Sequence, residues 1–425
     1  MENADNRRPR EMVGKVPPLL PMGVLRCIQG SETPPLRGRS LGQTFRLALP
    51  LAAEAGLTRF ADITGLDRVG IPVVSAIRPN AKSFSVSSGK GANVGAAWVS
   101  AIMEAIELYF AESATASCRY DELPAGTFVP DPTSLPRARG AGRLQYDQPD
   151  VEFSLGIDLT TDQEIAVPFD LVHAQLKPDW FNNGQGFLVS TNGIGSGNDR
   201  CEAALHAVCE VIERDAVAIM IAKDPQLSMR SFREIDLETV SDRDCQDLIA
   251  RCHAAGLQLY AYDITSDIGV PTIYCRLRDL VFSPFAYTDG AGSHPCSAVA
   301  LRRAITEAAQ TRLTVISGSR DDLAFSDYSL PGAQRSSSKS KEQEPIALRR
   351  DLDGPSSNVK EALCWVLSRL ETCGFGTAVC VDLGSRSGEL CFVRVVIPGL
   401  EGSTHSRYYQ PGRRALLARN GACAR

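Results

Sequence analysis

Residues 94–112 read VGAAWVSAIMEAIELYFAE, and this stretch determines how the rest of the chain has to fold. It is apolar almost all round, as in a helix with little surface facing water. Its few polar side chains include Ser100, Glu104 and Glu107, which fall within roughly 60° of one another at about 100° per residue. Carboxylates with apolar neighbours are expensive to bury unless a positive group pairs with them. Since this helix carries no Lys or Arg, the partner must come from elsewhere in the chain or be a metal ion.

The same pattern recurs twice, as a glycine-rich segment that leads into an alanine-rich helix with acidic residues along one side. The first glycine-rich segment is SSGKGANVG (87–95), the second is TNGIGSGN (191–198), and the third is DGAGS (289–293). We expect all three to be loops, followed in the later two cases by helices over Asp199–Ala222 and Ser297–Ile316. The polar side chains that share one side are Asn198, Glu202, His206, Glu210 and Glu213 for the second helix and Arg303, Glu307 and Gln310 for the third.

Three acidic stripes behind glycine-rich segments favour phosphate binding through a cation. Mg²⁺ takes oxygen ligands and binds through a few carboxylates together with substrate phosphates. Glycine loops at helix N-termini let backbone N–H groups approach an anion. Arg303, Arg312 and Lys90 are available to neutralise further phosphate charge.

Plainer interpretations stay open at this point. The second stripe could be a solvated helix face, and a structural Arg could pair with Glu104 and Glu107. Arg303 and Glu307 could form a surface ion pair at i,i+4. A structural role is favoured for His206. We expect Cys201 and Cys209, on the second helix, to belong to the core.

Composition excludes several classes of protein. The 425 residues carry a net charge of −5 without large blocks, so no nucleic-acid interface is expected. The 13 Cys form no C-x-x-C pair, which argues against a zinc ribbon or a secreted disulfide scaffold. The longest apolar run, Ala216–Ala222, is too short to cross a bilayer, and no signal peptide is evident. We therefore expect a cytoplasmic protein with no membrane association.

The fold class expected is α+β, because helices and strands are mixed without regular βαβ alternation. This excludes a Rossmann sheet, and the absence of GxxxxGK[ST] excludes a P-loop. No clear periodicity follows Gly399. The expected organisation is a flexible N-terminal arm over 1–30 and one domain over 31–425, with core motifs in 82–316, a polar mobile loop over 318–358 and a C-terminal part over 359–425.

The three blocks SSGKGANVGAAWVSAIMEAIELYFAE, TNGIGSGNDRCEAALHAVCEVIERDA and LRRAITEAAQTRL resemble the YcaO family and occur in its order. The resemblance covers roughly residues 35–405. It implies a YcaO-type fold with mixed or antiparallel sheets and helices around a central ATP and Mg²⁺ site. It also implies a homodimer that modifies backbone amides of ribosomally made peptides. In that reaction ATP would phosphorylate the amide oxygen after, or together with, attack by a nucleophile, and the phosphorylated oxygen would then leave.

The resemblance also implies site residues, position by position. ATP would be bound by Ser100, Glu104, Asn198, Arg303, Arg37, Thr44, Gln310 and Arg312. Mg²⁺ would be bound by Glu104, Glu107, Glu202, Glu210, Glu213 and Glu307. No catalytic acid or base is nominated.

The C-terminal end favours one branch of the family. Azoline-forming members typically end in a Pro-rich P-x-P-x-P tail, whereas this chain ends RRALLARNGACAR after its last proline, Pro411. This is more similar to the branch that works with a TfuA-like sulfur-delivery protein and forms thioamides. The alternatives are an azoline-forming cyclodehydratase and a nucleotide-binding accessory factor without its own chemistry.

Overall fold

The computed structural model describes residues 28, 36–140, 146, 151–176, 186–280, 287–319, 344–348, 358–386, 390–404, 406 and 408–421. The arm expected over 1–30 therefore lies outside the described residues except for Ile28. Most of the loop expected over 318–358 lies outside them as well.

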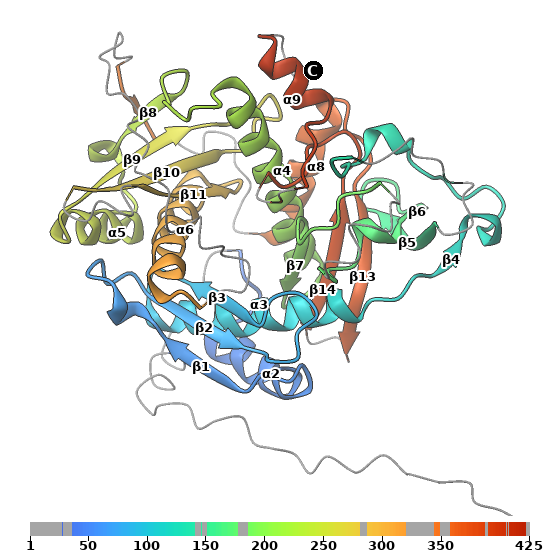
Figure 1. The fold of residues 1–425 in the computed structure, drawn as a ribbon, viewed down its shortest axis with the longest axis horizontal. Coiled ribbons are helices and arrows are strands. Elements are labelled where there is room, and N and C mark those ends of the chain that lie inside the picture. Colours follow the sequence, from blue (N-terminus) through green and yellow to red (C-terminus); the bar gives the residue numbers. More distant parts are fainter. Residues whose placement is uncertain are drawn as a thin grey trace, which may run out of the picture.

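Three β–α units form the centre of the molecule, and they are the three blocks of the sequence (Figure 1). In each unit a strand runs into a long helix. The pairs are β3 (Val86–Lys90) with α3 (Val94–Ser113), β7 (Ile194–Gly197) with α4 (Arg200–Lys223), and β11 (Tyr287–Ser293) with α6 (Ser297–Ser317). The side chains of Asn93 and Asp199 cap the first two helices by accepting from the backbone N–H of Ala96 and Glu202.

Each central strand belongs to a different sheet. The three-stranded sheet has the order β1 (Arg59–Asp62), β2 (Val73–Ile77), β3. The five-stranded sheet has the order β11, β10 (Thr272–Asp279), β9 (Leu257–Asp263), β8 (Arg233–Asp236), β12 (Ile346–Ala347). The six-stranded sheet has the order β4 (Cys118–Arg119), β5 (Glu152–Asp158), β13 (Val379–Arg386), β14 (Leu390–Val396), β7, with β6 (Glu164–Pro168) paired to β5.

Strand pairing confirms the α+β class. All the described pairs are antiparallel except β12 with β8. In Figure 1 the five-stranded and six-stranded sheets lie on opposite sides of α4, and the three-stranded sheet lies below them. The remaining helices are α2 (Leu41–Glu54), α5 (Arg243–Ala254), α8 (Val359–Thr372) and α9 (Arg413–Arg419), with 3-10 turns at Thr64–Leu66, Tyr120–Glu122, Pro132–Ser134, Phe169–Leu171 and Leu237–Thr239.

Most of the glycine-rich segments are strands: residues 87–90, 194–197 and 289–293 lie in β3, β7 and β11, so the loop conformation expected there was wrong. Residues 91–93 and 191–193 lie outside the strands. A Cβ added to Gly89 would lie 2.0 Å from the backbone N of Ala101, and one on Gly292 would lie 2.2 Å from the carbonyl O of Ala300. The glycines thus let each helix backbone rest directly on its own strand. Their role in these strands is close packing, which removes the argument that they form phosphate-binding loops.

Other expected elements have mixed outcomes. The sequence pattern predicts a hairpin of Val151–Leu159 and Glu164–Pro168 and helices over Leu41–Gly56 and Val359–Thr372, and β5–β6, α2 and α8 confirm them. It also predicts a short strand over Phe187–Thr191, but Phe187 makes only an isolated bridge to Arg137. The tail after Gly399, expected to lack periodicity, contains α9.

Burial explains both the apolar character of α3 and the cysteine count. Among the described helices, α3 is the one with the length and hydropathy of a membrane span, but 67% of its most apolar window is buried inside the protein. It packs with α2, β2 and β14 in one core cluster. Cys209 is a free thiol in a second core cluster, between α4 and α8, and Cys201 packs against that cluster, as expected.

Candidate functional site

The three central helices carry their polar side chains at equivalent positions. Counted from the N-cap residues Asn93, Asp199 and Cys296, the shared positions are the seventh, eleventh and fourteenth. The seventh holds Ser100, His206 and Arg303, the eleventh holds Glu104, Glu210 and Glu307, and the fourteenth holds Glu107, Glu213 and Gln310.

The residues at the fourteenth position join the three units in a cycle. Glu107 of α3 accepts a hydrogen bond from the hydroxyl of Ser196 in β7. Glu213 of α4 accepts one from the backbone N–H of Ser293 in β11, with an N–O distance of 3.1 Å. Gln310 of α6 donates to the carbonyl O of Ser88 in β3. Each helix therefore contacts the strand of the next unit, and the third unit returns to the first.

One end of the site is built around Glu202, which is buried. Its carboxylate accepts from Arg37 Nη1 at 2.5 Å and from Asn198 Nδ2 at 3.0 Å. Asn198 Oδ1 in turn accepts from the hydroxyl of Thr44 at 2.7 Å. The structure thus brings two groups of predicted residues together: Arg37 and Thr44, and Asn198 and Glu202. The two groups are more than 150 positions apart in the sequence.

The other end gathers three cations and three carboxylates. Lys90 Nζ lies 2.8 Å from Glu307 Oε2, and Arg303 Nη2 lies 4.0 Å from Glu213 Oε2. Arg214 stands between the carboxylates: it lies 3.9 Å from Glu307, 3.8 Å from Glu213 and, in the same cluster, 3.9 Å from Glu210.

Two of these three carboxylates are partly exposed to solvent, and the third is buried. The side chains of Glu210 and Glu307 are 16% and 18% exposed, and that of Glu213 is 2% exposed. Such values exclude the freely solvated helix face that the sequence left open. They also leave Glu210 and Glu307 an opening through which a ligand can reach them.

Enclosure and mutual repulsion disfavour the charged form of two of these groups. Burial raises the pKa of Glu107 to about 8, with Glu104 and Glu210 adding to the shift and the hydrogen bond from Ser196 opposing it. Burial raises the pKa of Glu210 to about 7, opposed chiefly by the charge of Arg214. Shifts of this kind are common at functional sites, and a further cation beside these two carboxyls would favour their charged form.

The chain was compared with known proteins. The profile of the YcaO family, described as YcaO cyclodehydratase, ATP- and Mg²⁺-binding, matches residues 88–401. A Rhizobium leguminosarum bv. trifolii protein, described as an uncharacterized protein in the tfuA 3' region, is 33% identical over 410 residues, which cover 89% of this chain and 92% of the relative. The chain belongs to the YcaO family. The relative's place beside tfuA agrees with the predicted resemblance to the TfuA-associated branch.

Further YcaO relatives agree in sequence and fold. An uncharacterized protein of Methanothermobacter thermautotrophicus is 34% identical over 360 residues, covering 81% of this chain and 90% of the relative. The structure of YcaO from Methanopyrus kandleri bound with AMPPCP and Mg²⁺ has a TM-score of 0.64 at 21% identity, covering 89% of this chain and 96% of that one. A heterocyclase in complex with substrate and cofactor has a TM-score of 0.68 at 20% identity, covering 86% of this chain and 53% of the heterocyclase, so this chain spans about half its length. These likenesses confirm the YcaO fold.

One predicted residue of the YcaO site has a different environment. Arg312 is 3% exposed, and its guanidinium lies 2.7 Å from Asp67 Oδ2 and 2.9 Å from Asp279 Oδ2. These ion pairs join α6 to the β1–β2 connection and to β10. These ion pairs support a structural role for Arg312, which competes with the prediction that Arg312 binds ATP.

Sequence reasoning missed two residues of this candidate site, Arg214 and His294. Arg214 follows Glu210 by four positions, so the helical wheel that found the acidic stripe contains it as well. Burial lowers the pKa of His294 to about 3, helped by the charges of Arg303 and Arg37. Its Nδ1 accepts from the backbone N–H of Cys296 at 3.0 Å, which leaves the proton of the neutral ring on Nε2.

His206 is neutral for the same reasons. Burial lowers its pKa well below the usual value, and Arg303 adds to the effect. No sequence motif marks His294, because it directly follows a glycine-rich strand rather than lying on a helix stripe.

The residues present fit a divalent cation by chemistry. All the predicted ligands are carboxylate oxygens, as Mg²⁺ prefers. Repulsion among Glu104, Glu107 and Glu210 is the condition that a cation relieves. The described residues hold no group of three metal-binding side chains already gathered around one point. Metal binding would thus require the carboxylates now paired with Lys90 and Arg214 to turn toward the ion.

Proposed function

We propose that this YcaO protein uses ATP and Mg²⁺ to replace the oxygen of a peptide backbone amide with sulfur. The observation that carries the proposal is the cluster of enclosed carboxylates and cations supplied by β3, α4 and α6, with Glu107 of α3 close enough to Glu210 for their charges to interact. The YcaO family is described as ATP- and Mg²⁺-binding, and a relative encoded beside tfuA supports the sulfur branch.

The proposed reaction balances as follows. The γ-phosphoryl group of ATP is transferred to the amide oxygen, and ADP is the other product. Hydrosulfide, HS⁻, forms a C–S bond at the same carbon, the C–O bond breaks, and the amide oxygen departs in hydrogen phosphate with the proton from HS⁻. Phosphorylation is needed because an amide oxygen is otherwise a poor leaving group.

The site residues bind and orient in this proposal. Mg²⁺ would be held among Glu104, Glu107, Glu202, Glu210, Glu213 and Glu307. Once bound, it would neutralise charge that develops on the transferring phosphoryl group. Arg303, Arg37, Asn198 and Ser100 would contact the nucleotide, and Thr44 holds Asn198 in place through their 2.7 Å hydrogen bond.

Cyclodehydration is the second candidate. The fold likeness to heterocyclases and the family's description as cyclodehydratases favour it. Here a Cys, Ser or Thr side chain of the peptide would replace HS⁻ as the nucleophile. Mass spectrometry of the modified peptide separates the two reactions, since oxygen replaced by sulfur supports thioamidation and loss of one water supports azoline formation.

The partners proposed are a ribosomally made peptide, a TfuA-like sulfur-delivery protein and a second copy of the chain. An accessory role remains the competing proposal. It predicts ATP binding without any peptide-dependent hydrolysis when peptide, partner and sulfide are all supplied.

The site is tested by Glu104→Gln and Glu202→Gln. Each should reduce Mg–ATP affinity by at least tenfold, measured by calorimetry, because a carboxylate ligand is lost while the side chain keeps its shape. The thermal unfolding temperature of Glu104→Gln should be kept or rise, since a buried charge has been removed, whereas that of Glu202→Gln should fall, because the ion pair with Arg37 is also lost.

Glu371→Gln, in which an exposed carboxylate at the end of α8 is neutralised, is the control and should bind as the parent does. Unchanged nucleotide affinity in both site variants would refute the assignment of these residues.

A further inference from the structure

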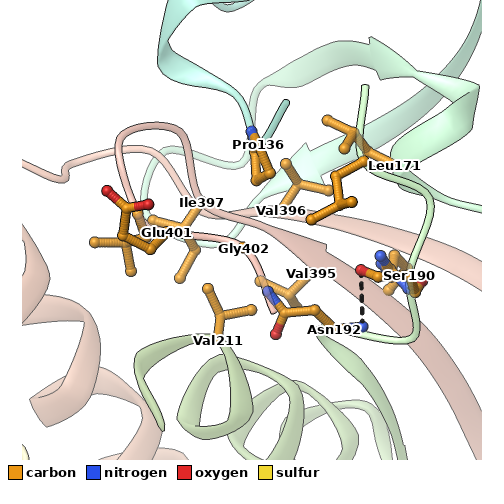
Figure 2. Close-up of a pocket in the computed structure, with 13 residues that line it drawn as sticks. Pro136, Leu171, Ser190, Asn192, Val211, Val395, Val396, Ile397, Glu401 and Gly402 are labelled. Atoms are coloured by element: carbon orange, nitrogen blue, oxygen red, sulfur yellow. Dashed lines mark hydrogen bonds between the residues drawn. The ribbon is translucent and has the colours of Figure 1, made fainter. Parts of the chain in front are cut away.

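A small cavity lies beside the acidic stripe of α4, at the edge of the six-stranded sheet (Figure 2). Its volume is about 20 Å³, which accommodates one species of roughly the size of water. Its described walls include Leu188, Val211, Asn192 and Arg394. Glu401 also lines it, and the carboxylate of Glu401 already accepts hydrogen bonds from Tyr409, Gly412 and Ala415. Figure 2 shows Asn192 and Val211 on one side of the cavity, opposite Val396 and Leu171.

Arg394 is an exception among the buried arginines. Five described arginines are buried, and four of them have a carboxylate oxygen within 2.9 Å: Arg78 with Glu112, Arg276 with Asp289, Arg312 with Asp67 and Arg414 with Asp215. Arg394 is 3% exposed, and its Nη1 donates to the carbonyl O of Ser190 at 2.8 Å. Within the described part of the chain its Nε has no hydrogen-bond partner and no carboxylate lies in salt-bridge range.

The cavity also contains an unpartnered acceptor. Asn192 is buried, and no described donor reaches its Oδ1. Its backbone N–H is held by Ser190 Oγ, as the dashed line in Figure 2 shows. A buried guanidinium without an anion is costly, and so is an unsatisfied amide oxygen. A small anion with one hydrogen to donate would satisfy both groups, and unlike a water molecule it would also neutralise the guanidinium.

The position of the cavity connects it to the proposed chemistry. Val211 lines it and directly follows Glu210, whose charge is felt by Arg394. Arg394 also pairs with Ile194 in the register of β14 and β7. Ile194 precedes Ser196 by two residues, and the hydroxyl of Ser196 donates to Glu107. An anion held at Arg394 would therefore be separated from the carboxylates proposed to hold Mg²⁺ by one residue along α4 and by two along β7.

We propose that this cavity, with Arg394 as donor and Asn192 as acceptor, is a binding site for a small monovalent anion and holds the hydrosulfide nucleophile. The sulfur assignment rests on the proposed thioamide function, whereas the anion site does not. Phosphate and carboxylate ligands are too large for the cavity. The apolar walls favour a weakly hydrated anion, and chloride, which has the same charge but no hydrogen to donate, is the competitor for the same site.

Arg394→Met tests the site kinetically. It keeps the length of the side chain but removes the charge, so we expect KM for hydrosulfide to rise about tenfold or more while KM for ATP and peptide changes less than twofold. Arg394→Lys keeps the charge and should recover part of the sulfide affinity. Arg278→Met, at a partly buried arginine stacked on Tyr287, is the control and should leave all three KM values unchanged.

A binding measurement separates failure of the site from failure of the proposed function. Crystals of the parent soaked in sodium bromide should show anomalous density in the cavity, and crystals of Arg394→Met should not. If bromide binds in the cavity but no thioamide product forms, the anion site is supported and its hydrosulfide role is overturned. Thioamide product with an unchanged sulfide KM in Arg394→Met, or water alone in the cavity under bromide, overturns the anion site. Competitive inhibition by chloride against hydrosulfide supports it.

Discussion

Glu107 and Glu210 bind protons at pH values where ordinary carboxylates are ionised. Their pKa values of about 8 and about 7 belong to the protein without metal, and burial is the main cause of both shifts. In the unfolded chain the same groups release their protons near pH 4.5. Proton uptake is therefore greater in the folded state between these limits.

The pH dependence of stability follows with a definite sign. Because the unfolded state binds fewer protons, the free energy of unfolding should fall as pH rises from about 4.5 to 8, by up to roughly 1.4 kcal/mol per pH unit for each carboxyl. Glu107→Gln should flatten this slope. Denaturant unfolding between pH 5 and pH 9 measures it, and a slope unchanged by the substitution would contradict the assigned cause.

Mg²⁺ should oppose this loss of stability. An ion bound among the stripes displaces protons from Glu107 and Glu210, so Mg–ATP affinity should increase between pH 6 and pH 9. Calorimetry in two buffers with different ionisation enthalpies counts the protons released. Equal heats in both buffers would show that neither carboxyl is protonated before binding.

At the scale of the elements, periodicity predicted the helices and failed for the central strands. α3, α4 and α6 were predicted because each keeps a polar stripe on an apolar background over many turns. β3, β7 and β11 were predicted as loops because glycine has no side chain to show a period of two. Close contact between strand and helix is a property of the folded backbone, and only the glycines themselves indicate it in the sequence.

The polar stripes of the candidate site were predicted from the sequence, but the contacts between them were not. The wheel placed Glu210, Glu213 and Glu307 on stripes, yet only the fold brings Arg214 and Lys90 to them. Residues of the sheet, such as Arg394, carry no periodic signal of their own. The nucleotide and metal roles of the stripe residues stay predictions from the family resemblance.

Close packing in the first unit makes a prediction for Gly89→Ala. A methyl group there would meet the backbone of Ala101, which cannot move without shifting α3 from β3. We expect a loss of about 3 kcal/mol in the free energy of unfolding, typical of overpacking, and weaker Mg–ATP binding. Gly65→Ala, with nothing within 4 Å of the new methyl, should change stability by less than about 1 kcal/mol. Equal effects of the two substitutions in denaturant unfolding would refute the packing role.

At the scale of the whole molecule, the end of the described chain is tied to the central helix. Arg414 of α9 lies 2.9 Å from Asp215 of α4 and 2.6 Å from Asp267 after β9. Glu401 accepts from the backbone N–H of Gly412 and Ala415, which fixes the start of α9. These contacts connect the C-terminal segment to the helix that carries three of the predicted metal ligands.

Arg414→Met should destabilise the protein by about 3–5 kcal/mol, because it leaves the charge of Asp215 buried without a cation beside it. Adding Asp215→Asn should restore a substantial part of the loss. Denaturant unfolding of the two single variants and the double variant gives the coupling energy. Additive losses would show that the pair does not act as a unit.

The cycle of contacts between the three units has a consequence for the order of folding. Its closing bond joins Ser88 to Gln310, which are 222 positions apart. During synthesis the first two units leave the ribosome well before the third, and a loop of this length closes late. Until then, the carboxylates of α3 and α4 can remain hydrated, and their burial is delayed until β11 and α6 dock. In refolding experiments, helix content should therefore return before the ability to bind nucleotide.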